Sequence, residues 1–248
     1  MTDRFANREV CDMIIYDFRT QKPILRCDYA NTNTTELTGE VVYAYGGQGH
    51  PKRVAFNGEK GGTFTFETQI QSFALYSIMT GAAVESSANV VTREVLTCAT
   101  AGQVTLTKTP VAGTVNVFAE NDDCGTEIAG TINTSTKVFT ATTTGDIAVN
   151  SKYVVYYQTP VSSDIKKLSI KSTVFPKAIR VVADTFEKTE ADEILPYQMV
   201  VYKCQPQTNI MLSNSNSGDP VTLTVTCDLM ADVNNNMIDL ILQDEVSA

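Results

Sequence analysis

The stretch YAYGGQGHPKRVAFNGEKGG, residues 43 to 62, combines six glycines, three lysine or arginine residues and the only histidine, His50. Glycine-rich cationic loops can bind phosphate, and histidine can act as a general acid or base. A phosphate-binding P-loop requires GxxxxGK[ST] at the start of a helix, and this spacing is missing here. His50 is followed by Pro51, as in many surface turns. We therefore predict a cationic loop between two strands instead of an active site.

Other residues that could do chemistry lack the required spacing. The 28 acidic residues could supply a glycosidase pair, but nothing in the sequence places two of them together. The stretch from Asp232 resembles a calcium loop, yet Met237 replaces its glycine and Gln243 its final glutamate. We predict a turn there, and we expect no catalytic residue, no enzymatic activity, no metal and no cofactor.

The six cysteines at positions 11, 27, 98, 124, 204 and 227 include no CxxC pair. Zinc sites need closely spaced ligands, so a structural zinc site is not supported. Free buried thiols are the favoured interpretation, because no export signal is visible at the N-terminus. Their pairing stays open, and Cys98 with Cys124 is the first pair to test.

Composition limits the possible partners. The 248 residues are 43% hydrophobic and 19% charged, with a net charge of −9, which is typical of a globular protein with an acidic surface. Nucleic-acid binding depends on Lys and Arg that neutralise phosphates, so we expect the chain to repel DNA. No apolar run approaches the roughly 18 residues of a membrane span. We expect folding in the cytoplasm and no membrane binding.

Period-two alternation predicts strands through most of the chain. Apolar residues alternate with polar ones along 37–45, 63–70 and 221–229, and 196–205 and 237–245 are further strand candidates. One segment differs: in residues 72–82, Ser72 is a good N-cap, Gly81 a good C-cap, and apolar residues lie in one helical stripe. We predict a short helix there; a further strand is the alternative.

Residues 95–161 are rich in Thr, Val, Ala and Gly. Short strands are expected at about 103–109, 114–119, 126–132, 136–142 and 152–159, separated by turn signals. Such spacing predicts a small inserted β-sandwich, similar to an immunoglobulin domain. The predicted fold is therefore all-β: a discontinuous sandwich or partial barrel of residues 1–94 and 162–248 with one short flanking helix, interrupted by a second domain at 95–161.

The order of motifs around the opening stretch resembles tail tube proteins of tailed bacteriophages, particularly those with contractile tails. The resemblance covers residues 35–94 and 162–245. It consists of Gly46-Gly47-Gln48-Gly49, the basic pair Lys52-Arg53, a turn at Asn57-Gly58, a strand from Thr63 to Gln69, and a helix from Phe73 to Gly81. The insert at 95–161 departs from compact members of that family.

The resemblance implies a structural virion protein, assembled in the host bacterial cytoplasm, that forms hexameric rings stacked into a tail tube. The expected partners are further copies of the chain and the tail sheath, baseplate and terminator proteins. DNA would pass through an acidic lumen during ejection without adhering. Contact candidates between copies are Gly46, Gly47, Gly49, His50, Lys52 and Arg53. Candidates for the lumen lining are Thr38, Glu40, Thr65, Glu67 and Gln69, although the same residues could face outside solvent.

Two alternatives stay open. A carbohydrate- or receptor-binding β module of a virion or cell surface would share the same fold, and a glycan array separates it from a tube subunit. The absence of tryptophan disfavours sugar stacking, although ten tyrosines are present. A β-sandwich hydrolase would require a carboxylate pair and would appear in a glycosidase screen.

Overall fold

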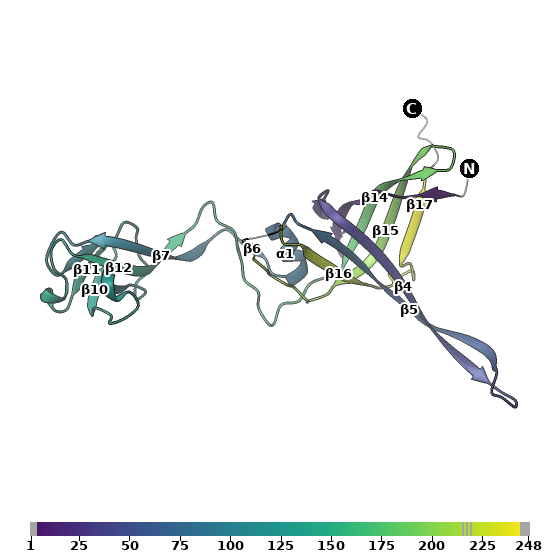
Figure 1. The fold of residues 1–248 in the computed structure, drawn as a ribbon, viewed down its shortest axis with the longest axis horizontal. Coiled ribbons are helices and arrows are strands. Elements are labelled where there is room, and N and C mark those ends of the chain that lie inside the picture. Colours follow the sequence, from purple (N-terminus) through teal and green to yellow (C-terminus); the bar gives the residue numbers. More distant parts are fainter. Residues whose placement is uncertain (1–3, 215, 217, 219, 244–248) are drawn as a thin grey trace. The chain divides into compact units, whose positions relative to one another are not determined.

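The computed structural model describes residues 4–214, 216, 218 and 220–243 (Figure 1). With 51% strand and 6% helix, it confirms the all-β fold. The chain divides into two compact units: the first is Met1–Val84 with Leu168–Ala248, and the second is Glu85–Lys167. Within the described ranges, no helix has the length and apolar character needed to cross a membrane.

The first unit is built on a nine-stranded sheet with the order β3-β2-β14-β15-β16-β5-β4, in which β1 also pairs with β14 and β17 with β15. Its strands are β1 (Phe5–Ala6), β2 (Asp12–Asp17), β3 (Pro23–Cys27), β4 (Ala30–Tyr45), β5 (Lys52–Thr68), β14 (Ile179–Thr189), β15 (Ile194–Pro206), β16 (Leu223–Leu229) and β17 (Ile238–Leu242). The strands expected at 196–205, 221–229 and 237–245 are thus β15, β16 and β17; residues 244 and 245 lie outside the described chain.

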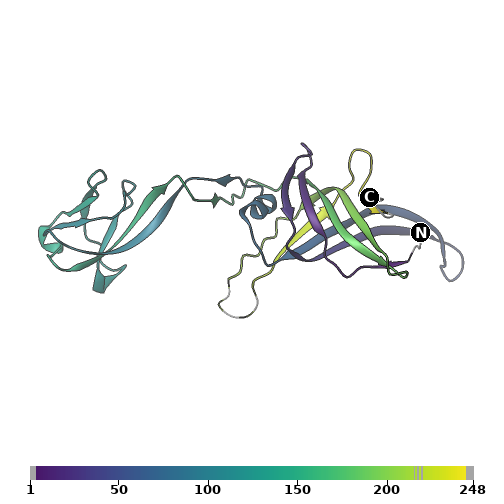
Figure 2. The same ribbon diagram turned by 90° about the horizontal axis from the view of Figure 1, so that it is seen from above.

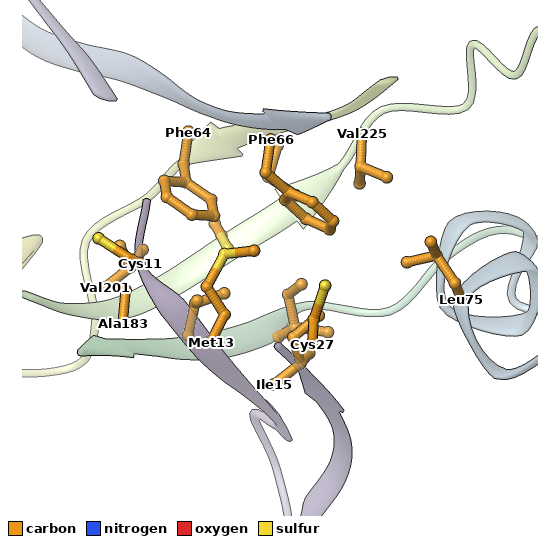
Figure 3. Close-up of a cluster of buried hydrophobic side chains, with 14 of the residues drawn as sticks. Cys11, Met13, Ile15, Cys27, Phe64, Phe66, Leu75, Ala183, Val201 and Val225 are labelled. Carbon is orange, nitrogen blue, oxygen red and sulfur yellow. The ribbon is translucent and has the colours of Figure 1, made fainter. Parts of the chain in front are cut away.

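The core of this unit lies on one face of the sheet. Phe64 and Phe66 of β5 point toward Met13 and Cys27, and Leu75 approaches from the helix (Figure 3). All five side chains are at most 1% exposed. Along β5, Phe64 and Phe66 alternate with Thr63, Thr65 and Glu67, which is the period-two pattern of a strand with one buried face.

The expected helix is present as α1 (Phe73–Thr80), so the strand alternative is wrong. Ser72 caps its start, since its hydroxyl accepts a hydrogen bond from the Leu75 amide at 3.1 Å. Gly81 ends it in the left-handed conformation at φ 72°. Leu75 and Met79 are buried, which places the apolar stripe of α1 against the sheet core.

The second unit contains two three-stranded sheets, β10-β11-β8 and β7-β12-β9, around its own core (Figure 2). Its elements are β7 (Ala88–Thr97), β8 (Gln103–Thr105), β9 (Asn116–Ala119), β10 (Gly130–Asn133), β11 (Val138–Ala141), β12 (Lys152–Val161) and the short 3₁₀ turns η1 (Glu120–Asp122) and η2 (Thr144–Asp146). The five strands expected here are confirmed, and β7 is additional. The segments that join the two units, β6 (Val84–Glu85) and β13 (Lys167–Leu168), pair as a two-stranded sheet.

The limits of this unit differ from those expected from composition. It runs from residue 85 to 167, whereas the composition shift was placed at 95 to 161. The reason is that β7 pairs with β12 over its whole length, from Ala88 opposite Val161 to Thr97 opposite Lys152. Composition does not reveal this pairing, because β7 is as rich in valine as the strands of the first unit.

The long loop expected at residues 43–62 is wrong in extent. Only residues 46–51 connect β4 to β5, and the turn expected at Asn57-Gly58 is part of β5. There, Val41 pairs with Asn57 and Gly39 with Lys60, with a register shift between them. Gly58 accommodates this irregularity, since a Cβ atom there would lie 3.3 Å from the Glu40 Cβ. Gly58, Gly61 and Gly62 therefore lie in a strand with an irregular ladder, not in a loop.

All six cysteines are free thiols, and Cys98 and Cys124 are not paired. Cys98 is buried and its thiol points to the Thr100 carbonyl oxygen at 3.1 Å. Cys124 is exposed, 3.6 Å from the Tyr156 hydroxyl. The hydrogen bond with Cys227 and burial raise the pKa of Cys204 well above its ordinary value, so this thiol stays protonated and unreactive.

Candidate assembly surfaces

The tip of the β4–β5 hairpin holds all six contact candidates. In the turn, the Gly46 amide donates to the Pro51 carbonyl at 3.3 Å and the His50 amide to the Gly47 carbonyl at 3.2 Å. Gly47 and Gly49 have φ of 90° and 86°, values that favour glycine, and His50 has φ 47°. The glycines therefore serve the turn geometry. Within the described chain, the imidazole of His50 has no hydrogen bond or ion pair, and it is exposed.

The two cations of the tip are held by local contacts. The Lys52 ammonium lies 3.8 Å from the centroid of the Tyr43 ring, a cation–π contact. The Arg53 guanidinium donates through Nε to the Gly46 carbonyl at 3.2 Å. Neither cation forms an ion pair with any acidic side chain in the described ranges. The tip thus presents two uncompensated positive charges to solvent.

Apolar side chains surround these cations and are exposed as well. Val42, Tyr45, Val54 and Phe56 are between 51% and 58% exposed, and every residue from Lys52 to Lys60 is exposed. Val42 pairs with Phe56, and Val54 lies on the same face two residues away, so these side chains form one exposed apolar patch of the kind that is typical of contact surfaces. The patch was not predicted from the sequence. The available signal was that apolar residues occupy both faces of these strands, as Val41 and Val42 show.

The tip extends well beyond the rest of the sheet (Figure 1). The last pair between β5 and β16 joins Thr63 to Asp228, so Lys52–Gly62 pairs only with β4. At about 3.3 Å per residue, these eleven residues reach roughly 36 Å past β16. Among the described strands, β4 pairs with β5 alone, which leaves its other edge open.

The five lining candidates do not form one cluster. Thr65 and Glu67 lie on the sheet face opposite the core, where the Thr65 hydroxyl donates to Thr226 at 3.2 Å. The Glu67 carboxylate accepts from the hydroxyls of Thr32 at 3.2 Å and Thr224 at 3.3 Å. Thr38 and Glu40 lie instead on the exposed part of β4, and Gln69 follows β5 in a bend.

The face that holds Thr65 and Glu67 is therefore a ladder of threonine hydroxyls and carboxylates across β4, β5 and β16. In the described part of the chain, no group of three or more His, Cys, Asp or Glu side chains is arranged to hold a metal ion. The structure therefore exposes three surfaces: an open sheet edge, a projecting hairpin and a polar sheet face.

These features define an all-β protein with an open sheet edge and a projecting hairpin. The model of the YomU/Tube protein family matches residues 7–241. The chain therefore belongs to this family, which confirms the tail tube assignment made from the motif order and makes the protein a structural component of the virion. Comparison with curated proteins gave no match.

Proposed function

We propose that the protein is a non-enzymatic tube protomer that forms hexameric rings, stacks them into a tail tube and thereby conducts DNA during ejection. Membership of the YomU/Tube family supports the tube role. The observation that carries the assembly step is the β4–β5 extension, in which both faces and the outer edge are exposed. In an isolated chain such a surface favours aggregation, whereas in an assembly a neighbouring subunit covers it and pairs with its open edge.

The polar face of the sheet is the proposed lumen lining. Thr65 and Glu67 on β5, with Asp228 on β16, give this face hydroxyls and negative charge. Phosphates are repelled by carboxylates, so DNA slides past such a surface without adhering. Thr38 and Glu40 extend the same chemistry along β4, at the mouth of each ring. Sheath, baseplate and terminator proteins are the proposed neighbours of the finished tube.

Electron microscopy of the concentrated, purified protein tests the proposal. We expect rings and stacked tubes, because each copy covers the exposed hairpin of a neighbouring copy. A protein that stays monomeric under every assembly condition would contradict the tube function.

The role of the tip is tested by Lys52→Glu with Arg53→Glu. We expect a folded monomer that forms no stacked tubes, since both cations are exposed and contribute little to the fold. The matched control is Lys166→Glu with Lys171→Glu, which changes the net charge equally at two exposed lysines outside the hairpin. Normal tubes from the tip variant would leave the tube function standing and remove the tip from the contact.

A further inference from the structure

A groove of about 730 Å³ opens in the first unit beside the N-terminal segment. It is formed by residues 9–12, by Asp184–Phe186 of β14 and by the start of β15. We call it the acidic groove, after its three carboxylates, Glu9, Asp12 and Asp184. Among the residues that the structure describes, no lysine or arginine lines it. It is thus a depression with a negative rim.

The carboxylates of the acidic groove are largely uncompensated. In the described part of the chain, Glu9 and Asp184 form no ion pair, and Asp184 accepts only a hydrogen bond from the Gln198 amide at 2.8 Å. Asp12 has a single, exposed cation, Arg26, at 3.6 Å. An exposed pair at this distance contributes little, so the groove keeps most of its negative charge.

Apolar side chains line the same groove and are exposed. Val10, Phe186 and Ile194 are 37%, 58% and 64% exposed, although large apolar residues of a sheet usually lie inside. A surface that combines exposed apolar groups with free carboxylates fits a ligand with exposed apolar groups and free cations. A plain acidic surface patch would not need the apolar floor.

One segment of this chain has the complementary composition. The hairpin tip carries Lys52 and Arg53 without acidic partners, flanked by the exposed Tyr45, Val54 and Phe56. Figure 1 shows the tip far from β14 and β15, which supply much of the lining of the groove. The tip of one copy therefore has to find the groove of another copy.

We propose that the acidic groove receives the cationic hairpin tip of a second copy of this chain. The contact joins two different surfaces, so a pair of bound copies still offers one free tip and one free groove. Such head-to-tail contacts close into rings or continue into helical stacks. The proposal rests on the proposed tube function and adds the receiving surface. It also explains why neither surface is compensated within its own chain.

Two single-surface variants test the contact. The tip variant Lys52→Glu/Arg53→Glu keeps its groove, and the groove variant Glu9→Lys/Asp184→Lys keeps its tip; all four residues are exposed. We expect neither to form tubes alone, and we expect the two mixed together to co-assemble as a 1:1 complex in sedimentation velocity, because every tip then meets a groove of opposite charge. This complex should be at least tenfold tighter than the self-association of either variant and should weaken as salt is raised. Circular dichroism checks that both are folded.

Further arms separate this proposal from the tube function itself. The chain carrying all four reversals should regain tubes, because both charge signs are exchanged. The control Glu127→Lys/Asp146→Lys reverses two exposed carboxylates of the second unit and should assemble normally. Tubes from the groove variant, or no 1:1 complex in the mixture, would overturn the groove assignment. If the mixed variants form the 1:1 complex but the wild-type protein never forms tubes, the contact is supported and the tube function is contradicted.

Discussion

The β4–β5 hairpin has two halves, one buried on one face and the other exposed to solvent on both faces. In the half nearest the helix, residues 63–68 of β5 alternate between buried and half-buried side chains, with β4 on one side and β16 on the other. In the tip half, Lys52–Lys60 of the same strand is exposed on both faces, with β4 as its only partner. One continuous strand thus passes from a protein core into solvent.

The difference shows what alternation in a sequence can and cannot tell. Leu37 has polar residues on both sides in the sequence, as Phe64 and Phe66 do. Yet Leu37 is 66% exposed and Phe66 is 1% exposed, because only Phe66 belongs to the buried cluster that the helix and strands β2, β3 and β14 form with β5. Period two fixes which residues share a face, and whether that face is buried depends on what packs against it.

The largest contrast is expected for two phenylalanines of β5. Phe66→Ala removes a fully buried ring and should lower the free energy of unfolding of the first unit by about 3–5 kcal/mol. Phe56→Ala, at a site that is 58% exposed, should change it by less than about 0.5 kcal/mol. Urea denaturation measures both, with the second unit as internal reference. Equal losses would mean that the tip half is buried in the monomer.

Two glycines sharpen the comparison at the boundary between the halves. A Cβ at Gly62 would clash with the Glu36 carbonyl oxygen and lie 3.0 Å from Leu229, so Gly62→Ala should cost about 1–3 kcal/mol. Gly39→Ala is the control, because nothing lies within 4 Å of a Cβ there, and it should stay within about 0.5 kcal/mol. Thermal melts that rank these two variants in the reverse order would refute the boundary drawn here.

The smallest effect is expected for two threonines. Thr65→Val keeps the β-branched shape and removes the hydrogen bond to Thr226, which should cost about 0.5–1.5 kcal/mol. Thr38→Val changes an exposed residue of the tip half and should stay within about 0.5 kcal/mol. Denaturant midpoints of the two variants provide the test, and an unchanged midpoint for Thr65→Val would remove the polar ladder as a stabilising element.

The sequence predicted α1 well because its signals are local. The helix signals lie within ten residues of one another: the N-cap Ser72, the apolar stripe with Leu75 and Met79, and the C-cap Gly81. No residue distant in sequence was needed to predict the helix. The hairpin was predicted less well. Glycines at 58, 61 and 62 suggested a loop, whereas pairing with β4 holds them in a strand. Strand ladders are formed by residues far apart in sequence, and one chain's composition does not reveal them.

The candidate site divides in the same way. Gly46, Gly47 and Gly49 were predicted as turn residues from their type alone, and the φ near 90° of Gly47 and Gly49 favours glycine. The acidic groove had no sequence signal, because Glu9 lies more than 170 positions before Asp184 and Ile194 in the chain. Only the pairing of the sheet assembles them.

By itself, the sequence determined the all-β class, the helix, the turn at the hairpin tip and the positive charge of that tip. These follow from residue types and short-range spacing, which act through local backbone preferences and side-chain periodicity. The tertiary structure alone decided how far the hairpin projects, which of its apolar residues stay in solvent and where the acidic groove lies. Each of these depends on contacts between distant segments, because burial and pairing are properties of the folded chain as a whole.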